Sequence, residues 1–106
     1  MYCVVYRFKL KSGKEKVFEK NWADFTKAIH RVCGSLGSRL HKSDTPQIYW
    51  AYAQWPSKKL FDKKRPDSCY QPPELEARKQ MVESTESIEK VFQGPIVTDL
   101  LEAGIT

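Results

Sequence analysis

One stretch of the sequence constrains the fold more than any other. Residues 47–57, QIYWAYAQWPS, are rich in aromatic residues and end at a proline and a serine. Such a run is typical of a β-strand, in which alternate side chains point to opposite faces. Alternation divides it into two apolar sets, which are Ile48, Trp50 and Tyr52 on one face and Tyr49, Ala51, Ala53 and Trp55 on the other. Because neither set is polar, we expect both faces of the sheet to be covered.

The elements before this strand follow from hydrophobic periodicity. Residues 2–10 alternate and are rich in β-branched and aromatic side chains, which predicts a first strand. Across residues 14–32, large apolar residues recur every three or four positions, so we expect an amphipathic helix that ends at Gly34. Residues 35–43 predict a short strand, which the turn letters SDTP join to the strand of residues 47–55 as a hairpin. The apolar stripe of the helix consists of Phe18, Trp22, Phe25, Ile29 and Val32.

The second half of the chain predicts two helices and a last strand. Pro56 ends the hairpin, and Ser57 suits the N-cap of a short helix over residues 58–64. A longer helix is expected to start at the proline pair 72–73 and to end at the letters QGP. The short apolar run 96–101 predicts the final strand. The stripe of the longer helix would be Met81, Thr85, Ile88 and Phe92.

The order of the main elements, β-α-β-β-α-β, predicts a ferredoxin-like α+β fold in a single domain over residues 1–106. Right-handed crossovers place both helices on one face of a four-stranded antiparallel sheet. We expect the face with Tyr49, Ala51, Ala53 and Trp55 to point away from the helices. Monomers seldom leave a large apolar patch in water, so we expect a second copy to cover this face. Two sheets would then form a dimeric α/β barrel, in which the two alanines leave room for a central space.

Composition excludes several functional classes. Much of the net charge of +5 comes from residues 58–65, with five Lys or Arg against one Asp, which is typical of a solvated surface segment. Cys3, Cys33 and Cys69 are far apart and form no C-x-x-C pair, so we expect reduced thiols in the cytoplasm. No run approaches the ~18 consecutive apolar residues of a membrane span. Because the chain begins directly with strand-like residues, we expect neither secretion nor membrane binding.

The same order of elements also describes an RNA-recognition module. The third strand of such a module begins with Lys or Arg, then Gly, then an aromatic residue. The letters QIYWAYAQW contain neither the basic residue nor the glycine. The RNA-binding sheet would also have to stay open in a monomer. We therefore expect no nucleic-acid partner, and an RNA-recognition module is the weakest alternative.

Three segments resemble a known family. The letters YRFKLKSGKEKVFEKNW, GSLGSRLHKS and YAQWPSKKLF are similar to the antibiotic biosynthesis monooxygenase domain of the dimeric α/β-barrel superfamily, and the resemblance covers residues 2–101. It implies twofold dimers with a cavity either between the helices and the sheet or within the barrel. In the enzymes of the family it implies cofactor-free oxygenation of electron-rich phenols, while one branch degrades haem. It thus implies a homodimeric monooxygenase that acts on an aromatic small molecule. The alternative is a catalytically silent dimer of the same fold that binds a ligand or is purely structural.

The resemblance also bears on individual residues. Trp55 occupies the position of the tryptophan that the haem-degrading branch places against its cofactor, and a core tryptophan is the alternative. That branch has an asparagine where this sequence has Tyr6. It has a histidine on the second helix, where this sequence offers Arg78 and Lys79. We therefore do not expect haem degradation, and we expect catalysis without a cofactor or a metal ion.

Further candidates come from the strands. A histidine, with an unperturbed pKa of about 6.5, suits a general base for a phenol, so His41 is a candidate catalytic residue. A half-exposed strand histidine fits His41 equally well. Arg39 shares its face and would stabilise a phenolate or superoxide, or would simply lie on the surface. Tyr6 and Tyr49 would donate hydrogen bonds to a substrate or would pack in the core. Two histidines and scattered cysteines do not form a metal site.

Overall fold

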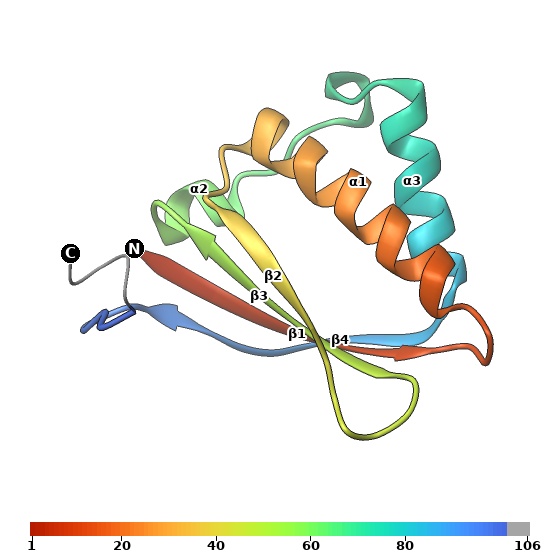
Figure 1. Cartoon of the computed structure of the whole chain (residues 1–106). Helices are drawn as coiled ribbons and strands as arrows, with labels where there is room; N and C mark the ends of the chain where they lie inside the picture. Colours follow the sequence, from red (N-terminus) through yellow and green to blue (C-terminus); the bar gives the residue numbers. More distant parts are fainter. Residues whose placement is uncertain (102–106) are drawn as a thin grey trace.

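A central strand organises the computed structural model, which describes residues 1–101 (Figure 1). β1 (Tyr2–Leu10) pairs on one side with β3 (Ile48–Trp55) and on the other with β4 (Thr85–Pro95). β2 (Gly37–Lys42) pairs with β3 and forms an edge, so the antiparallel sheet has the order β2-β3-β1-β4. This arrangement confirms the expected ferredoxin-like α+β fold.

The helices lie on one side of the sheet (Figure 1). The long helices are α1 (Glu15–Cys33) and α3 (Pro72–Glu83), which pack against each other. A short helix, α2 (Lys58–Asp62), follows β3, and a 3-10 turn (Asp67–Cys69) precedes α3. Within residues 1–101, no helix is long and apolar enough to cross a membrane.

Local signals in the first half of the chain act as the sequence indicates. Gly34 adopts a left-handed conformation with φ of 76°, and its N–H donates to the His30 carbonyl at 3.2 Å, which ends α1. The Ser57 hydroxyl accepts a hydrogen bond from the Leu60 N–H at 3.1 Å and caps α2. The hairpin, α1 and α2 are therefore confirmed, with boundaries that shift by one or two residues.

The second half differs from the expectation, because α3 ends at Glu83 and residues 85–95 form β4. The Ser84 and Thr85 hydroxyls donate to carbonyls three residues earlier, each at 2.7 Å, so they satisfy the last turn of the helix. Residues 85–95 then pair along the whole of β1. The predicted helix through Phe92 is wrong, and so is the predicted strand at residues 96–101, which are neither helix nor strand.

The two faces of β3 are reversed relative to the expectation. Tyr49, Ala51 and Trp55 are buried on the helix side of the sheet, where Phe18 packs edge-on against Tyr49 with ring centroids 5.5 Å apart. We call the opposite side the open face. It carries Arg7 of β1, Arg39 and His41 of β2, Trp50 and Tyr52 of β3, and Glu89 and Phe92 of β4. The open face therefore mixes aromatic and charged side chains and is not the apolar surface that the sequence predicts.

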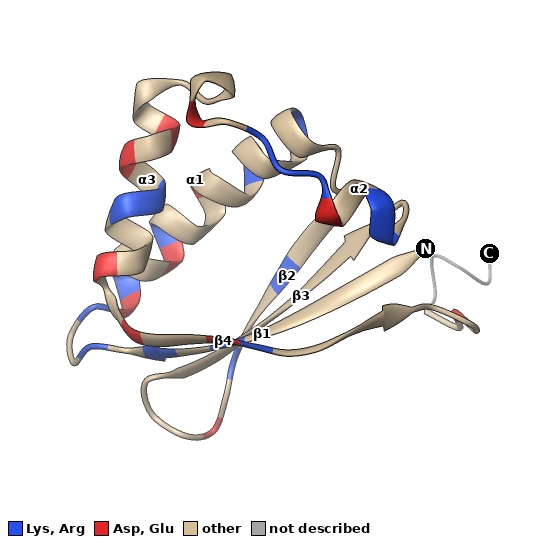
Figure 2. Ribbon diagram, turned by 180° about the vertical axis from the view of Figure 1, so that it is seen from behind, with Lys and Arg blue, Asp and Glu red and all other residues tan. Residues whose placement is uncertain are grey.

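Charges are distributed unevenly over the surface. Figure 2 shows basic residues gathered on α2 and the loop after it, whereas α3 carries both signs. Arg31 of α1 forms an ion pair with Glu74, and Arg78 pairs with Asp67 at 2.9 Å. These pairs tie α3 to α1 and to the preceding turn, and because they are partly solvated they contribute only modestly to stability.

The hydroxyl of Tyr49 makes an interaction that is suited to a stability test. It donates a hydrogen bond of 2.5 Å to the Glu19 carboxylate. Burial, together with the hydrogen bond and the negative charge of Glu19, raises the pKa of Tyr49 to about 12. Above pH 10 an unfolded chain therefore loses this proton before the folded chain does, so stability falls as the pH rises from 10 to 12.

The substitution Tyr49→Phe tests this hydrogen bond. Because the Glu19 side chain lies at the surface and regains water, we expect the free energy of unfolding at pH 7 to fall by only about 1 kcal/mol. We also expect the variant to lose less stability than wild type between pH 10 and 12. Urea unfolding at pH 7 and at pH 11 measures both effects, and an unchanged alkaline slope would contradict the assignment.

Candidate active site

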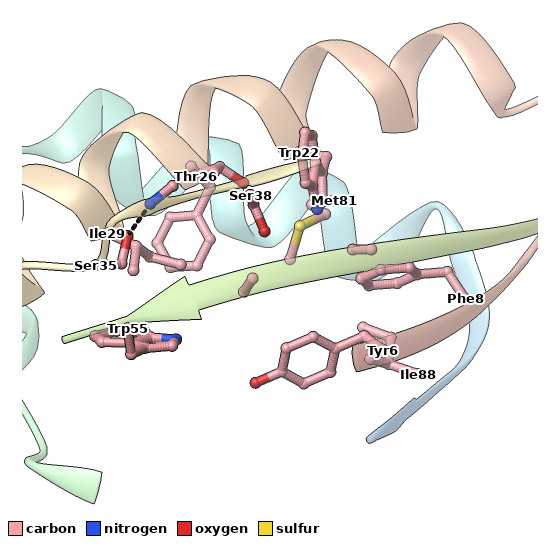
Figure 3. A pocket seen from close by; sticks show the side chains of 14 residues that line it. Tyr6, Phe8, Trp22, Thr26, Ile29, Ser35, Ser38, Trp55, Met81 and Ile88 are labelled. Carbon is pink, nitrogen blue, oxygen red and sulfur yellow. Dashed lines mark hydrogen bonds between the residues drawn. The ribbon is translucent and has the colours of Figure 1, made fainter. Parts of the chain in front are cut away.

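A cavity of about 220 Å³ lies between the helix side of the sheet and α1 (Figure 3). β1 and β3 form its floor, α1 forms its roof, and the start of β2 closes one wall. Single residues from α3 and β4 complete the lining. The lining residues are Tyr6, Phe8, Trp22, Phe25, Thr26, Ile29, Ser35, Gly37, Ser38, Ala51, Ala53, Trp55, Met81 and Ile88.

The cavity exists because small residues face large ones. In β3 the alanines at positions 51 and 53 stand on the helix side between Tyr49 and Trp55. α1 spans the sheet above them and presents Trp22, Phe25 and Ile29, which cannot descend far enough to fill the space over two methyl groups. The small residues that the sequence predicts to leave room do so, but the room lies between sheet and helices.

Hydrogen-bond donors project into this apolar space. The Tyr6 hydroxyl and the Trp55 indole nitrogen point into the cavity from its floor, and the side chain of Trp22 lies at the opposite wall (Figure 3). Within residues 1–101, no chain atom accepts a hydrogen bond from these three side chains, and none of their polar atoms is fully buried from solvent. An indole N–H can only donate. The cavity therefore offers donors to a ligand that carries an acceptor.

The electrostatics of the cavity are set by burial. An ordinary tyrosine is protonated at neutral pH, and burial raises the pKa of Tyr6 further, so its phenol acts as a donor. Among the described residues that line the cavity, none is Asp, Glu, His, Lys or Arg. The Ser38 hydroxyl donates to the Tyr52 carbonyl at 3.1 Å, which leaves its oxygen free to accept. The cavity thus binds through shape and neutral hydrogen bonds.

The five residues that the sequence singles out do not form one site. Tyr6 and Trp55 line the cavity together. Tyr49 lies on the same face but packs in the neighbouring core, and its hydroxyl donates to the carboxylate of Glu19. Arg39 and His41 are exposed on the open face, on the other side of the sheet, where residues 96–101 lie beside them. The roles predicted for these five residues stay predictions.

Sequence reasoning missed the roof of the cavity. Trp22, Phe25 and Ile29 are expected there only as the buried stripe of a helix. The signal that would have found them is the pairing of an aromatic helix stripe with a strand face that contains two alanines. Met81 and Ile88 were not identifiable in this way, because the sequence places both on one helix, whereas they belong to α3 and β4.

The remaining clusters of reactive side chains are sparse. Within residues 1–101, no group of three or more His, Cys, Asp or Glu side chains is placed to hold a metal ion. Cys33 is buried, and its sulfur lies 3.2 Å from the Tyr70 hydroxyl, outside the cavity lining.

A stability measurement tests whether the Tyr6 hydroxyl is without a hydrogen bond within the described chain. Tyr6→Phe removes a group that has no hydrogen bond within the described chain, so we expect the free energy of unfolding to change by less than about 0.5 kcal/mol. Tyr2→Phe is the matched control, because the Tyr2 hydroxyl accepts a hydrogen bond from the Gln93 amide at 2.6 Å. We expect the control to lose about 1 kcal/mol. Chemical unfolding measures both values, and equal losses would mean that Tyr6 is bonded within the chain.

The first part of the chain matches a family profile. The profile of the family described as antibiotic biosynthesis monooxygenase matches residues 1–63. This match includes β1, α1, the hairpin and α2, and therefore Tyr6, Trp22 and Trp55. A search of curated proteins found no significant match.

Solved structures share the fold at low sequence identity. SnoaB, a cofactor-independent oxygenase from Streptomyces nogalater, is 20% identical with a TM-score of 0.70, over 95% of this chain and 97% of SnoaB. A protein from Bordetella bronchiseptica, provisionally assigned as an antibiotic biosynthesis monooxygenase, is 22% identical with a TM-score of 0.70, over 92% and 97% of the two chains. A protein from Chloroflexus aurantiacus with the same provisional assignment is 12% identical with a TM-score of 0.71, over 92% and 94%. Because the family profile matches more than half of the sequence, the chain belongs to the antibiotic biosynthesis monooxygenase family.

Proposed function

We propose that the protein is a cofactor-independent monooxygenase that oxidises a phenolic small molecule in the cavity between the sheet and α1. Membership of the family and the likeness to SnoaB support an oxygenase. The observation that carries the proposal is the cavity itself, which is apolar and has the Tyr6 hydroxyl and the indole N–H groups free to bind a ligand oxygen. An aromatic ring fits the apolar walls, and a phenol oxygen fits the donors.

The proposed reaction needs no external reductant. The phenol loses its proton, and the phenolate passes one electron to O₂. The two radicals combine at a ring carbon to form a C–O bond, and protonation gives a hydroperoxide. The O–O bond then breaks, the hydrogen on that ring carbon leaves as a proton, and the products are a quinone and one water molecule. Phenol plus O₂ therefore balances quinone plus water.

The residues of the cavity would support this reaction by positioning and by hydrogen bonding. Tyr6 and Trp55 would donate to the phenolate oxygen, and neutral donors in a largely apolar site stabilise such an anion. The rings of Phe8, Trp22 and Phe25 would pack against the substrate ring. No lining residue is a base at neutral pH, so the proton would leave to solvent and the acidity of the substrate would set the rate.

Two substitutions test these roles. We expect Tyr6→Phe and Trp55→Phe each to lower kcat/KM by about 10–100-fold, at or below the effect of removing one oxyanion-hole donor. Tyr2→Phe, whose hydroxyl lies outside the cavity, is the control and should keep the wild-type value. Oxygen uptake with a panel of phenols and hydroquinones measures the rates. If the folded protein takes up no oxygen across a broad panel, the catalytically silent alternative is favoured.

The pH profile tests whether the substrate loses its proton to solvent or to a base on the protein. We expect kcat/KM to rise with pH through the pKa of the substrate phenol, and the midpoint to move to lower pH when a more acidic phenol is used. Initial rates of oxygen uptake at several pH values, with phenols that differ in acidity, measure this shift. A midpoint that stays the same for every substrate would indicate a base on the protein. His41 would then be the first candidate, with the substrate on the open face.

We also propose that two copies associate through the open face. Phe92 is 55% exposed there, and the half-buried Trp50 and Tyr52 share the same side of the sheet. Arg7 and Glu89 on this face pair with each other at 3.5 Å and so require no charged partner.

Three free cysteines fit a reducing compartment, and we propose the cytoplasm.

Sedimentation tests the dimer. We expect wild type to sediment as a dimer at micromolar concentration and Phe92→Asp to raise the dissociation constant at least about tenfold, because a buried carboxylate without a partner is costly. Val82→Asp, which alters an apolar residue 47% exposed on α3, is the matched control and should stay dimeric. A wild-type monomer at this concentration would contradict the association.

A further inference from the structure

We infer that the cavity selects uncharged aromatic hydroxy compounds of one or two rings, and that it rejects carboxylated compounds and those with three or more rings. This inference rests on the proposed function, because it names the substrate class of the same cavity. Three properties of the cavity carry it: its volume, the absence of charge in its described lining, and the kind of hydrogen-bonding atoms that it offers.

The volume limits the number of rings. An engineered protein cavity of about 150 Å³ holds benzene, and pockets for drug-sized ligands measure about 300–1,000 Å³. The cavity here measures about 220 Å³, which exceeds the benzene site and falls short of the larger pockets. Its floor belongs to the paired strands β1 and β3, and its roof is α1, which packs on α3. Packed elements of this kind yield little, so a third ring would have to project through the open side of the cavity, where it gains no contact with the walls.

The described lining excludes charged ligands. It contains no cationic side chain that would pair with a carboxylate and no anionic one that would pair with an amine. Because the hydroxyl oxygen of the substrate takes the available donors, an additional carboxylate or ammonium group would be left without a partner, and its transfer into such a site is strongly unfavourable. On the helix side, Lys90 stands opposite Tyr6, but its Nζ lies over the Phe61 ring, 5.4 Å from the ring centroid, and Lys90 is not part of the lining. Arg7, Arg39 and Lys9 lie on the opposite side of the sheet. A carboxylated substrate would therefore be attracted to the open face and not to the cavity.

The hydrogen-bonding atoms favour a hydroxyl group. Tyr6, Trp22 and Trp55 offer donors, and Ser38, whose proton is committed to the Tyr52 carbonyl, offers an acceptor. A phenol oxygen accepts from the former, and a phenol O–H donates to the latter. A plain aromatic hydrocarbon would leave these donors without partners, so it should bind more weakly than the corresponding phenol.

Ala53 is the position where added bulk tests the volume. It lines the cavity and pairs with Val4 on one side and Ser38 on the other, so its side chain stands in the middle of the floor. Ala53→Leu adds three carbon atoms in the cavity and removes no polar group. Ala53→Ser is the matched control of nearly unchanged size. Ile88→Trp fills the cavity from β4, where Ile88 is 40% exposed. This variant replaces Ala53→Leu in the test if Ala53→Leu does not fold.

The experiment is calorimetric titration of the full-length protein with four probes. We expect 1-naphthol to bind at least about tenfold more tightly than naphthalene, 1-hydroxy-2-naphthoate and the three-ring 9-phenanthrol, a ratio worth about 1.4 kcal/mol. We expect Ala53→Leu to weaken the binding of 1-naphthol at least about tenfold, and Ala53→Ser to change it by less than about threefold. Circular dichroism verifies that each variant is folded.

The outcomes separate this inference from the proposed function. Binding of the carboxylate or of the three-ring compound as tight as that of 1-naphthol, or no binding of 1-naphthol, overturns the inference even if another phenol is oxidised. Selective binding of 1-naphthol, with no oxygen uptake on any hydroxyarene that binds, supports the ligand class and overturns the monooxygenase. Unchanged affinity in both Ala53→Leu and Ile88→Trp places the ligand elsewhere and also overturns the inference.

Discussion

The register of β1 against β3 decides where the other features of this protein lie. Tyr6 stands opposite Ala51, and Val4 stands opposite Ala53. This pairing puts a phenol, two methyl groups and Trp55 on one side of the sheet, under the aromatic stripe of α1. A slip of one residue would turn the floor residues of one strand to the open face and bring charged side chains such as Arg7 under the helix. Burial of that charge without a partner would cost far more free energy than leaving the cavity unfilled does, so the register is strongly specified.

The same alternation separates two chemical environments that are one sheet apart. The helix side holds neutral donors in an apolar space, and the open face holds Arg39, His41 and paired charges. Each environment would suit a different substrate. The apolar side favours an uncharged phenol that becomes an anion only when it loses its own proton. The open face would suit a substrate with an anionic group, which would lie near the imidazole of His41. Family membership alone does not choose between them, and the apolar walls and unbonded donors of the cavity favour the helix side.

Sequence periodicity predicts the first half of this fold well, because its signals are local. The repeat of α1, the glycine that ends it and the serine that caps α2 each act within a few residues. β4 was missed because Thr85, Ile88 and Phe92 have helical spacing, while the strand is stabilised by pairing with β1, about eighty residues away in the chain. The faces of β3 were reversed because alternation is symmetric and does not say which side the helices cover. As a result, two residues that the sequence singles out, Tyr6 and Trp55, line the cavity, whereas its helical roof was not predicted.

The proposed chemistry makes only a small demand on the sequence. A reaction in which the substrate supplies the electrons and O₂ accepts them requires the protein to orient a ring, to stabilise one oxygen and to exclude water. Shape and one or two neutral donors meet these requirements, and many apolar sequences build the same shape. The three solved structures share the fold of this chain at identities of 12–22%. If the protein carries out the proposed reaction, the volume over two small strand residues, Ala51 and Ala53, would set the substrate more than any charged residue would.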